Sequence, residues 1–164
     1  MWLLRFLMLL ALVVWIGGII FFAFVLAPTL FSVLPTTKLA GDVVNATLTK
    51  LHWMGLVSGV VFLVSSLAYN WEKHAQLGIF ALSHIFVVLM LAFTMVSQCG
   101  ITPRMRAIRE RLEQAKVATT PTWDDTARAE FNRLHAWSTR LESGVLFLGL
   151  GVVVLTARRF GNNS

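Results

Sequence analysis

The stretch FLMLLALVVWIGGIIFFAFVLAPTLFSVLPTT, residues 6–37, decides the fold class because it contains no Asp, Glu, Lys or Arg. A helix that crosses the roughly 30 Å hydrocarbon core of a bilayer needs about 20 apolar residues. Three further runs free of these charges lie at 51–71, 74–103 and 143–157. Only 13% of the 164 residues are charged, against about a quarter in soluble domains. The sequence therefore predicts an integral membrane protein that lies in a lipid bilayer.

The charge-free runs predict one domain, 1–164, with an all-α fold. We expect a four-helix bundle whose helices cross the membrane at about 6–27, 51–70, 76–98 and 138–157. Two short amphipathic helices are expected at the interface, at about 36–50 and 103–117, because their apolar residues recur every three to four positions. The last helix is expected to run without a break from a linker near 118–122 through Ala157.

The net charge of +6 is interpreted as a sign of topology and not of nucleic-acid binding, because short cytoplasmic loops collect Lys and Arg. With four crossings, loops one and three share a side that holds ten basic residues, whereas the termini and loop two hold four. This excess predicts loops one and three in the cytoplasm and both termini outside. The arginines that follow Pro103 are expected on the membrane surface, where they attract anionic lipid headgroups.

Polar side chains enter the membrane at the start of the last helix. The stretch FNRLHAWSTRLESG, residues 131–144, precedes an apolar run of only fifteen residues, which covers about 22 Å. Glu142 is therefore expected at or inside the hydrocarbon edge. His135, Ser138 and Glu142 are spaced three and four apart, so with Phe131 they form one face of a helix. Because charge is costly in lipid, we predict that this face points into the bundle.

Four side chains of metal-ligating type are predicted near one mouth of the bundle: His52, Cys99, His135 and Glu142. Imidazole, thiolate and carboxylate are ligands for a transition metal, although no HxxxH or CxxC pattern accompanies them. Two alternatives stay open. These groups can hydrogen-bond between helices, with Glu142 paired to an arginine or to His135, or they can line a path for protons or a solute.

His84 is predicted to enter from the opposite side of the membrane, at a depth of about 12 Å. Trp15, Gly17 and Gly18 fall at a similar depth. A histidine that faces a glycine-lined space can ligate a haem through its imidazole, and the alternative is an interhelical hydrogen bond. Because His84 and His52 are expected roughly 20 Å apart along the membrane normal, they cannot share one metal.

The segments WIGGIIFFAFVLAPTLFSVLP, ITPRMR and FNRLHAWS resemble the bacterial domain of unknown function 4149, a group similar to transmembrane protein 205. The matching positions, in the order of the chain, are Trp15, Gly17, Gly18, Ala27, Pro28, Phe31, Leu34, Pro35, Ala40, Gly41, Thr102, Pro103, Arg104, Phe131, Leu134, His135 and Ser138. Relatives often carry Asn where this chain has Glu142, which adds a charge or a titratable proton.

The resemblance implies a four-helix, multi-pass protein of the bacterial inner membrane and supplies no mechanism. The sequence shows no nucleophile with a base and no phosphate-binding loop, so an enzyme is not favoured. We interpret the chain as a structural or accessory subunit of a membrane complex, with lipid and other membrane subunits as partners. A transporter-like or metal- or haem-binding membrane protein is the alternative.

Overall fold

The computed structural model describes residues 2–73, 78–117 and 125–161. In chain order the elements are α1 (Trp2–Phe21), the π-helical turn η1 (Phe22–Leu26), α2 (Ala27–Val33), α3 (Thr37–Lys73), α4 (Gly78–Met95), the π-helical turn η2 (Val96–Ile101), α5 (Thr102–Val117) and α6 (Asp125–Gly161). No strand occurs within these described ranges. The predicted all-α class is therefore confirmed.

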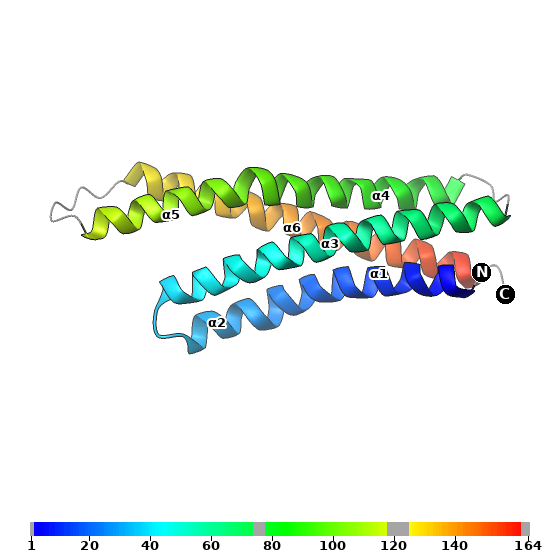
Figure 1. Ribbon diagram of the computed structural model, residues 1–164, viewed down its shortest axis with the longest axis horizontal. Coiled ribbons are helices and arrows are strands. Elements are labelled where there is room, and N and C mark those ends of the chain that lie inside the picture. Colours follow the sequence, from blue (N-terminus) through cyan, green and yellow to red (C-terminus); the bar gives the residue numbers. More distant parts are fainter. Residues whose placement is uncertain (1, 74–77, 118–124, 162–164) are drawn as a thin grey trace.

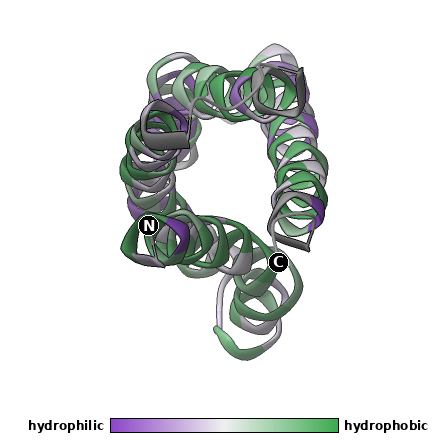
Figure 2. Cartoon of the chain, turned by 90° about the vertical axis from the view of Figure 1, so that its right-hand side faces the viewer, coloured by the Kyte–Doolittle hydropathy of each residue, from purple (hydrophilic) through white to green (hydrophobic). Residues whose placement is uncertain are grey.

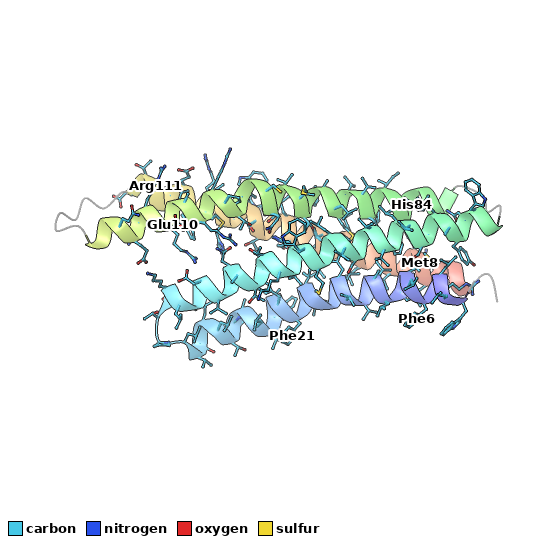
Figure 3. All side chains as sticks on the ribbon, in the orientation of Figure 1. Phe6, Met8, Phe21, His84, Glu110 and Arg111 are labelled. Carbon is cyan, nitrogen blue, oxygen red and sulfur yellow. The ribbon has the colours of Figure 1, made fainter. Side chains whose placement is uncertain are left out.

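Four long rods form a bundle, because α1, η1 and α2 are continuous and so are α4, η2 and α5 (Figure 1). Each rod contains a helix that is long and apolar enough to cross a membrane. Seen along the bundle, the four rods surround a common axis and much of each ribbon is coloured as hydrophobic (Figure 2). Many large apolar side chains are exposed. Phe6 and Phe21, for example, are exposed on the outside of α1 (Figure 3). Such a surface suits contact with lipid and makes this a multi-pass membrane protein.

The two segments predicted as short interfacial helices are parts of longer helices. Residues 37–50 form the first part of α3, and α5 continues α4 through η2. The sequence between 37 and 73 has no proline that would end the helix, so α3 runs through the expected boundary near Leu51. Residues 76–77, at the start of the predicted third crossing, lie outside the described residues.

Both π-helical turns lie just before a proline. In η1 the N–H of Ala27 donates to the carbonyl of Phe22, and in η2 the N–H of Thr102 donates to the carbonyl of Ser97. Pro28 and Pro103 follow directly, and a proline lacks an N–H and crowds the preceding turn of a helix. The widened turn lets each rod continue past its proline. Single π-helical turns are frequent at functional sites, and these two lie at the same end of the bundle.

The turn between α2 and α3 is set by its own sequence. Leu34 adopts an extended backbone with ψ of 140°, as expected for a residue that precedes a proline, here Pro35. The hydroxyl of Thr36 accepts a hydrogen bond of 3.2 Å from the N–H of Leu39, which caps α3. The chain therefore reverses direction within three residues and returns along α2.

The core is centred on Trp15 of α1, which is buried against a glycine face of α3. A Cβ atom at Gly55 would overlap the Nε1 atom of Trp15, and one at Gly59 would lie 2.7 Å from its Cζ3 atom. The pair of glycines four residues apart therefore accommodates the indole, which is the close approach expected of small residues in membrane bundles. Toward the other end, α2 and the start of α3 diverge from α5 and the start of α6 (Figure 1).

Candidate functional site

A cavity of about 490 Å³ lies at the end where the rods diverge. We call it the interhelical cavity. One wall comes from α1, η1, α2 and α3. It is mainly apolar, with Ile19, Phe22, Ala23, Ala27, Phe31, Val44 and Leu48, and α3 adds Thr37, Gly41 and Asn45. The opposite wall is more polar and comes mainly from α5 and α6, and includes Thr102, Arg109, Phe131, His135, Ser138, Thr139 and Glu142. Its volume is within the usual range of ligand pockets, about 300–1,000 Å³.

The polar wall is largely the face of α6 that the sequence singles out. Phe131, His135, Ser138 and Glu142 all line the interhelical cavity. The rings of Phe131 and His135 are parallel, with centroids 6.3 Å apart, because residues four apart on a helix lie above one another. Ser138 is buried, and its hydroxyl oxygen is 3.5 Å from the hydroxyl of Ser97 in η2. This face therefore runs from the rim of the cavity, at Phe131, to its inner end, at Glu142.

Three helices bring an imidazole, an amide and a carboxyl group together at the inner end. The Nδ1 atom of His52 lies 2.8 Å from Oε1 of Gln98, and its Nε2 atom lies 2.5 Å from Oε1 of Glu142. The His52 side chain is 2% exposed and that of Glu142 is 19% exposed. Because Gln98 accepts from Nδ1–H, one proton is shared between Nε2 and the carboxyl oxygen, either as imidazolium with carboxylate or as imidazole with carboxylic acid.

Arg109 of α5 lies at the rim of the interhelical cavity. Its Nη1 atom donates to Oδ1 of Asp42 at 2.9 Å, and its guanidinium carbon lies 5.6 Å from the centre of the Phe131 ring. Gly41 makes this possible, because a Cβ atom there would lie 2.7 Å from Nη2 of Arg109. The guanidinium therefore lies directly on the backbone of α3, held by a carboxylate and an aromatic ring.

Polar contacts close the seam between α3 and α5. Besides the Asp42–Arg109 pair, Lys38 forms a 2.7 Å ion pair with Glu113, and Arg106 donates to the hydroxyl of Thr49 at 2.6 Å. On the other side, within the described residues, α2 packs on α3 and makes no substantial contact with α6. Along α3 and α5 the backbones are likewise not in close contact, so these side-chain contacts bridge that side of the interhelical cavity. Among the described residues no such side-chain bridge is described between α2 and α6, and we take this side as the route into the cavity.

The predicted metal ligands do not all meet. Cys99 is exposed, and its sulfur lies 3.5 Å from that of Met95 on the same rod. His135 lines the cavity nearer its rim, and only His52 and Glu142 are in contact. Within the described ranges, no three His, Cys, Asp or Glu side chains are placed to hold one metal ion. A transition-metal site at these residues stays a prediction.

His84 lies on α4 near the end of the bundle opposite to Glu110 and Arg111 (Figure 3). The glycines expected to leave room beside it are packed or face outward. A Cβ at Gly18 would meet Leu51 and Met54, whereas Gly17 has open space. The structure thus describes no glycine-lined space beside His84 at Gly17 and Gly18, and haem binding there stays a prediction.

Other residues that carry the family resemblance lie in the core, beside the π-helical turns and in the turn between α2 and α3. Trp15 is in the core, Pro28 and Pro103 follow the π-helical turns, and Pro35 lies in the turn between α2 and α3. Arg104 is exposed at the start of α5. These residues shape the bundle around the cavity and do not line it.

Sequence reasoning missed the inward direction of Arg109 and the contribution of Asn45 and Asp42. Arg109 was expected on the membrane surface with the other arginines of α5. A signal was present, because Thr102, Met105 and Arg109 are spaced three and four apart and all line the cavity. The partner on α3 had no such signal, because Asp42 is 67 residues away in the sequence.

Comparison with known proteins gives a family and no function. Residues 10–114 match a family model described as a domain of unknown function, DUF4149. No curated protein and no solved structure matches the chain, and the similarity to transmembrane protein 205 stays a prediction. The match covers more than half of the chain, so the chain belongs to the DUF4149 family.

Proposed function

We propose that this DUF4149 protein is an accessory protein of the bacterial inner membrane that binds an amphipathic small molecule in the interhelical cavity. The molecule enters from the bilayer between α2 and α6. Binding a lipid-soluble ligand fits either an accessory subunit of a membrane complex or a protein that presents the ligand to partner subunits.

One observation carries this proposal: segments far apart in the sequence converge on one cavity. Ala27, Phe31 and Gly41 come from the first third of the chain, and His135 and Ser138 come from the last third. All five belong to the segments that carry the family resemblance. Packing alone would distribute such residues through the core, whereas the observed lining is concentrated at the end of the bundle where the two halves separate.

The two walls of the interhelical cavity differ in polarity, which favours an amphipathic ligand. Phe22, Ala23 and Leu48 offer hydrocarbon, whereas Ser138 and Glu142 on the facing wall offer hydrogen-bonding groups. Ligand pockets are generally apolar with a few placed polar groups that orient the ligand. Access from the lipid side supports a ligand that is already dissolved in the membrane.

Ala27→Phe is expected to empty the interhelical cavity. The larger ring projects from the apolar wall, and overpacking a filled site costs about 1–3 kcal/mol, which corresponds to about tenfold or more in occupancy at the middle of that range. The measurement is mass spectrometry of small molecules that co-purify with the full chain in mild detergent. Val25→Phe is the matched control, because Val25 is exposed on the same rod and does not line the cavity. Equal ligand content in both variants would contradict the proposal.

A transporter-like function is the second candidate, favoured by the proton shared between His52 and Glu142 at the inner end of the cavity. Glu142→Gln removes that proton-holding carboxyl group while keeping a hydrogen-bonding side chain of the same size. Ligand flux that depends on a proton gradient would support this candidate over an accessory role.

The topology is tested separately. We propose that loops one and three face the cytoplasm and that both termini are periplasmic, because ten basic residues lie on the loop side and four on the other. Alkaline phosphatase fused after Ser164 should be active, since it folds only outside the cytoplasm, and green fluorescent protein fused at the same position should be dark. The reverse pair of results would invert the topology.

A further inference from the structure

We propose that the interhelical cavity selects an amphiphile whose head group is uncharged and bears oxygen, and excludes lipids with a phosphate head group. This inference rests on the proposed function and deepens it by naming the ligand class. It is carried by the way in which the protein compensates each formal charge that lines the cavity.

The ionisable groups at the inner end of the cavity carry no net charge. Glu142 lines the cavity, but its Oε1 atom lies 2.5 Å from Nε2 of His52. If the shared proton is on the imidazole, the two groups carry opposite charges, and if it is on the carboxyl group, both are neutral. In either arrangement the pair has no net charge, and a head group beside it meets no unbalanced ion.

The rim is compensated in the same way. Arg109 is the only lysine or arginine among the described residues that line the cavity. Oδ1 of Asp42 accepts its Nη1–H at 2.9 Å. Phe131 covers the guanidinium, whose carbon lies 5.6 Å from the ring centre. The Asp42 carboxylate already takes the Nη1 side of the guanidinium and balances its charge, so a phosphate would have to share Arg109 with an existing counter-ion.

A phosphate head group would therefore add one uncompensated negative charge to a cavity with one apolar wall and one wall whose charges are already balanced. At an effective dielectric constant of about 20, charges 4 Å apart interact by several times the thermal energy, so such an ion is strongly disfavoured without its own counter-charge. A neutral head group has no such cost. Hydroxyl or carbonyl oxygens can instead hydrogen-bond to Ser138, Asn45 and His135, which offer both donors and acceptors.

The hydrocarbon part of the ligand then lies on the apolar wall. Phe22, Ala23 and Ala27 cover that side of the cavity, next to the proposed route between α2 and α6. This orientation places the head group toward α6 and the chain toward the bilayer. Anionic lipids are left to the exposed arginines on the outside, including Arg104 and Arg111.

The test uses two probes with the same acyl chain and glycerol that differ by one phosphate group: 1-oleoylglycerol and 1-oleoyl-lysophosphatidate. Binding to the full chain is titrated by native mass spectrometry from phosphatidylcholine nanodiscs, and binding to Ala27→Phe is subtracted as adsorption outside the cavity. We expect the neutral probe to bind at least about tenfold more tightly, since an uncompensated charge costs more than the 1.4 kcal/mol that this ratio represents.

Asp42→Asn should reduce or abolish the preference for the neutral probe, because it leaves Arg109 with a positive charge and no carboxylate. We expect the lysophosphatidate affinity to rise by about tenfold or more in this variant. Glu113→Gln is the matched control. It removes the carboxylate of the Lys38–Glu113 ion pair on the same seam, and neither of these residues lines the cavity, so the preference should stay as in the parent chain.

The outcomes separate the two proposals. Lysophosphatidate binding as tight as, or tighter than, that of the neutral probe in the parent chain would overturn the selectivity and leave the proposed function standing. An unchanged preference in Asp42→Asn would overturn the charge-compensation argument. Saturable binding of neither probe, together with no co-purified amphiphile, would overturn both.

Discussion

Replacing His52 with leucine should lower the free energy of unfolding by about 3–5 kcal/mol, as expected when one partner of a buried charged pair is removed. His52 is 2% exposed, and its Nε2 atom is hydrogen-bonded to Oε1 of Glu142 at a distance of 2.5 Å. Without the imidazole, the carboxyl group faces a leucine side chain, and Gln98 also loses the Nδ1–H that it accepts. Both groups would be left with unsatisfied hydrogen-bonding atoms at membrane depth.

The companion variants distinguish a lost charge pair from lost packing. Glu142→Gln keeps a hydrogen bond to His52 and should cost only about 1 kcal/mol. The double variant with leucine at both 52 and 142 removes the orphaned carboxyl group, so it should be more stable than His52→Leu alone, because an apolar pair often replaces a buried ion pair at little cost. The unpaired amide oxygen of Gln98 remains and should keep it about 1–3 kcal/mol below the parent chain.

The measurement is reversible unfolding by sodium dodecyl sulfate in mixed micelles, followed by circular dichroism. Ser143→Ala is the control on the same helix: Ser143 is exposed and donates only to the carbonyl of Thr139, so a change within about 0.5 kcal/mol is expected. A His52→Leu chain as stable as the parent would show that the pair contributes nothing to the fold.

Gly55→Ala should destabilise the bundle by about 1–3 kcal/mol through overpacking. The added methyl group overlaps Nε1 of Trp15. The indole cannot shift along α3, because it also covers Gly59, where a Cβ would lie 2.7 Å from Cζ3. The substitution therefore forces α1 and α3 apart along the contact that centres the core.

Two further variants test this explanation by the same unfolding measurement. Gly17→Ala should change stability by no more than about 1 kcal/mol, since nothing lies within 4 Å of a Cβ there. Trp15→Phe supplies a smaller ring, so the cost of Gly55→Ala should fall by about 0.5 kcal/mol or more in that background. Additive effects of the two substitutions would mean that Gly55 does not act through Trp15.

The polar face of α6 can be predicted from the local sequence alone. The spacing of His135, Ser138 and Glu142 places them on one helical face, and the short apolar run that follows predicts that this face turns inward. Helical periodicity is a property of the local backbone, so this prediction needs no partner helix. The sequence also places His52 and Glu142 at the same mouth of the bundle, as candidate metal ligands. It names an arginine or His135 as the hydrogen-bonding partner of Glu142, whereas in the structure that partner is His52.

The amino-acid sequence by itself determined that this protein is a helical membrane bundle, because uninterrupted apolar runs can satisfy their backbone hydrogen bonds in lipid only as helices. It also determined the glycine pair on α3 and the polar face of α6, which are periodic along one chain segment. Only the tertiary structure decided that Arg109 turns toward Asp42 and that His52, Gln98 and Glu142 meet. These contacts depend on the rotation of each rod about its axis. Lipid surrounds all faces of a helix with equally apolar material, so that rotation is set by packing and interhelical hydrogen bonds between rods.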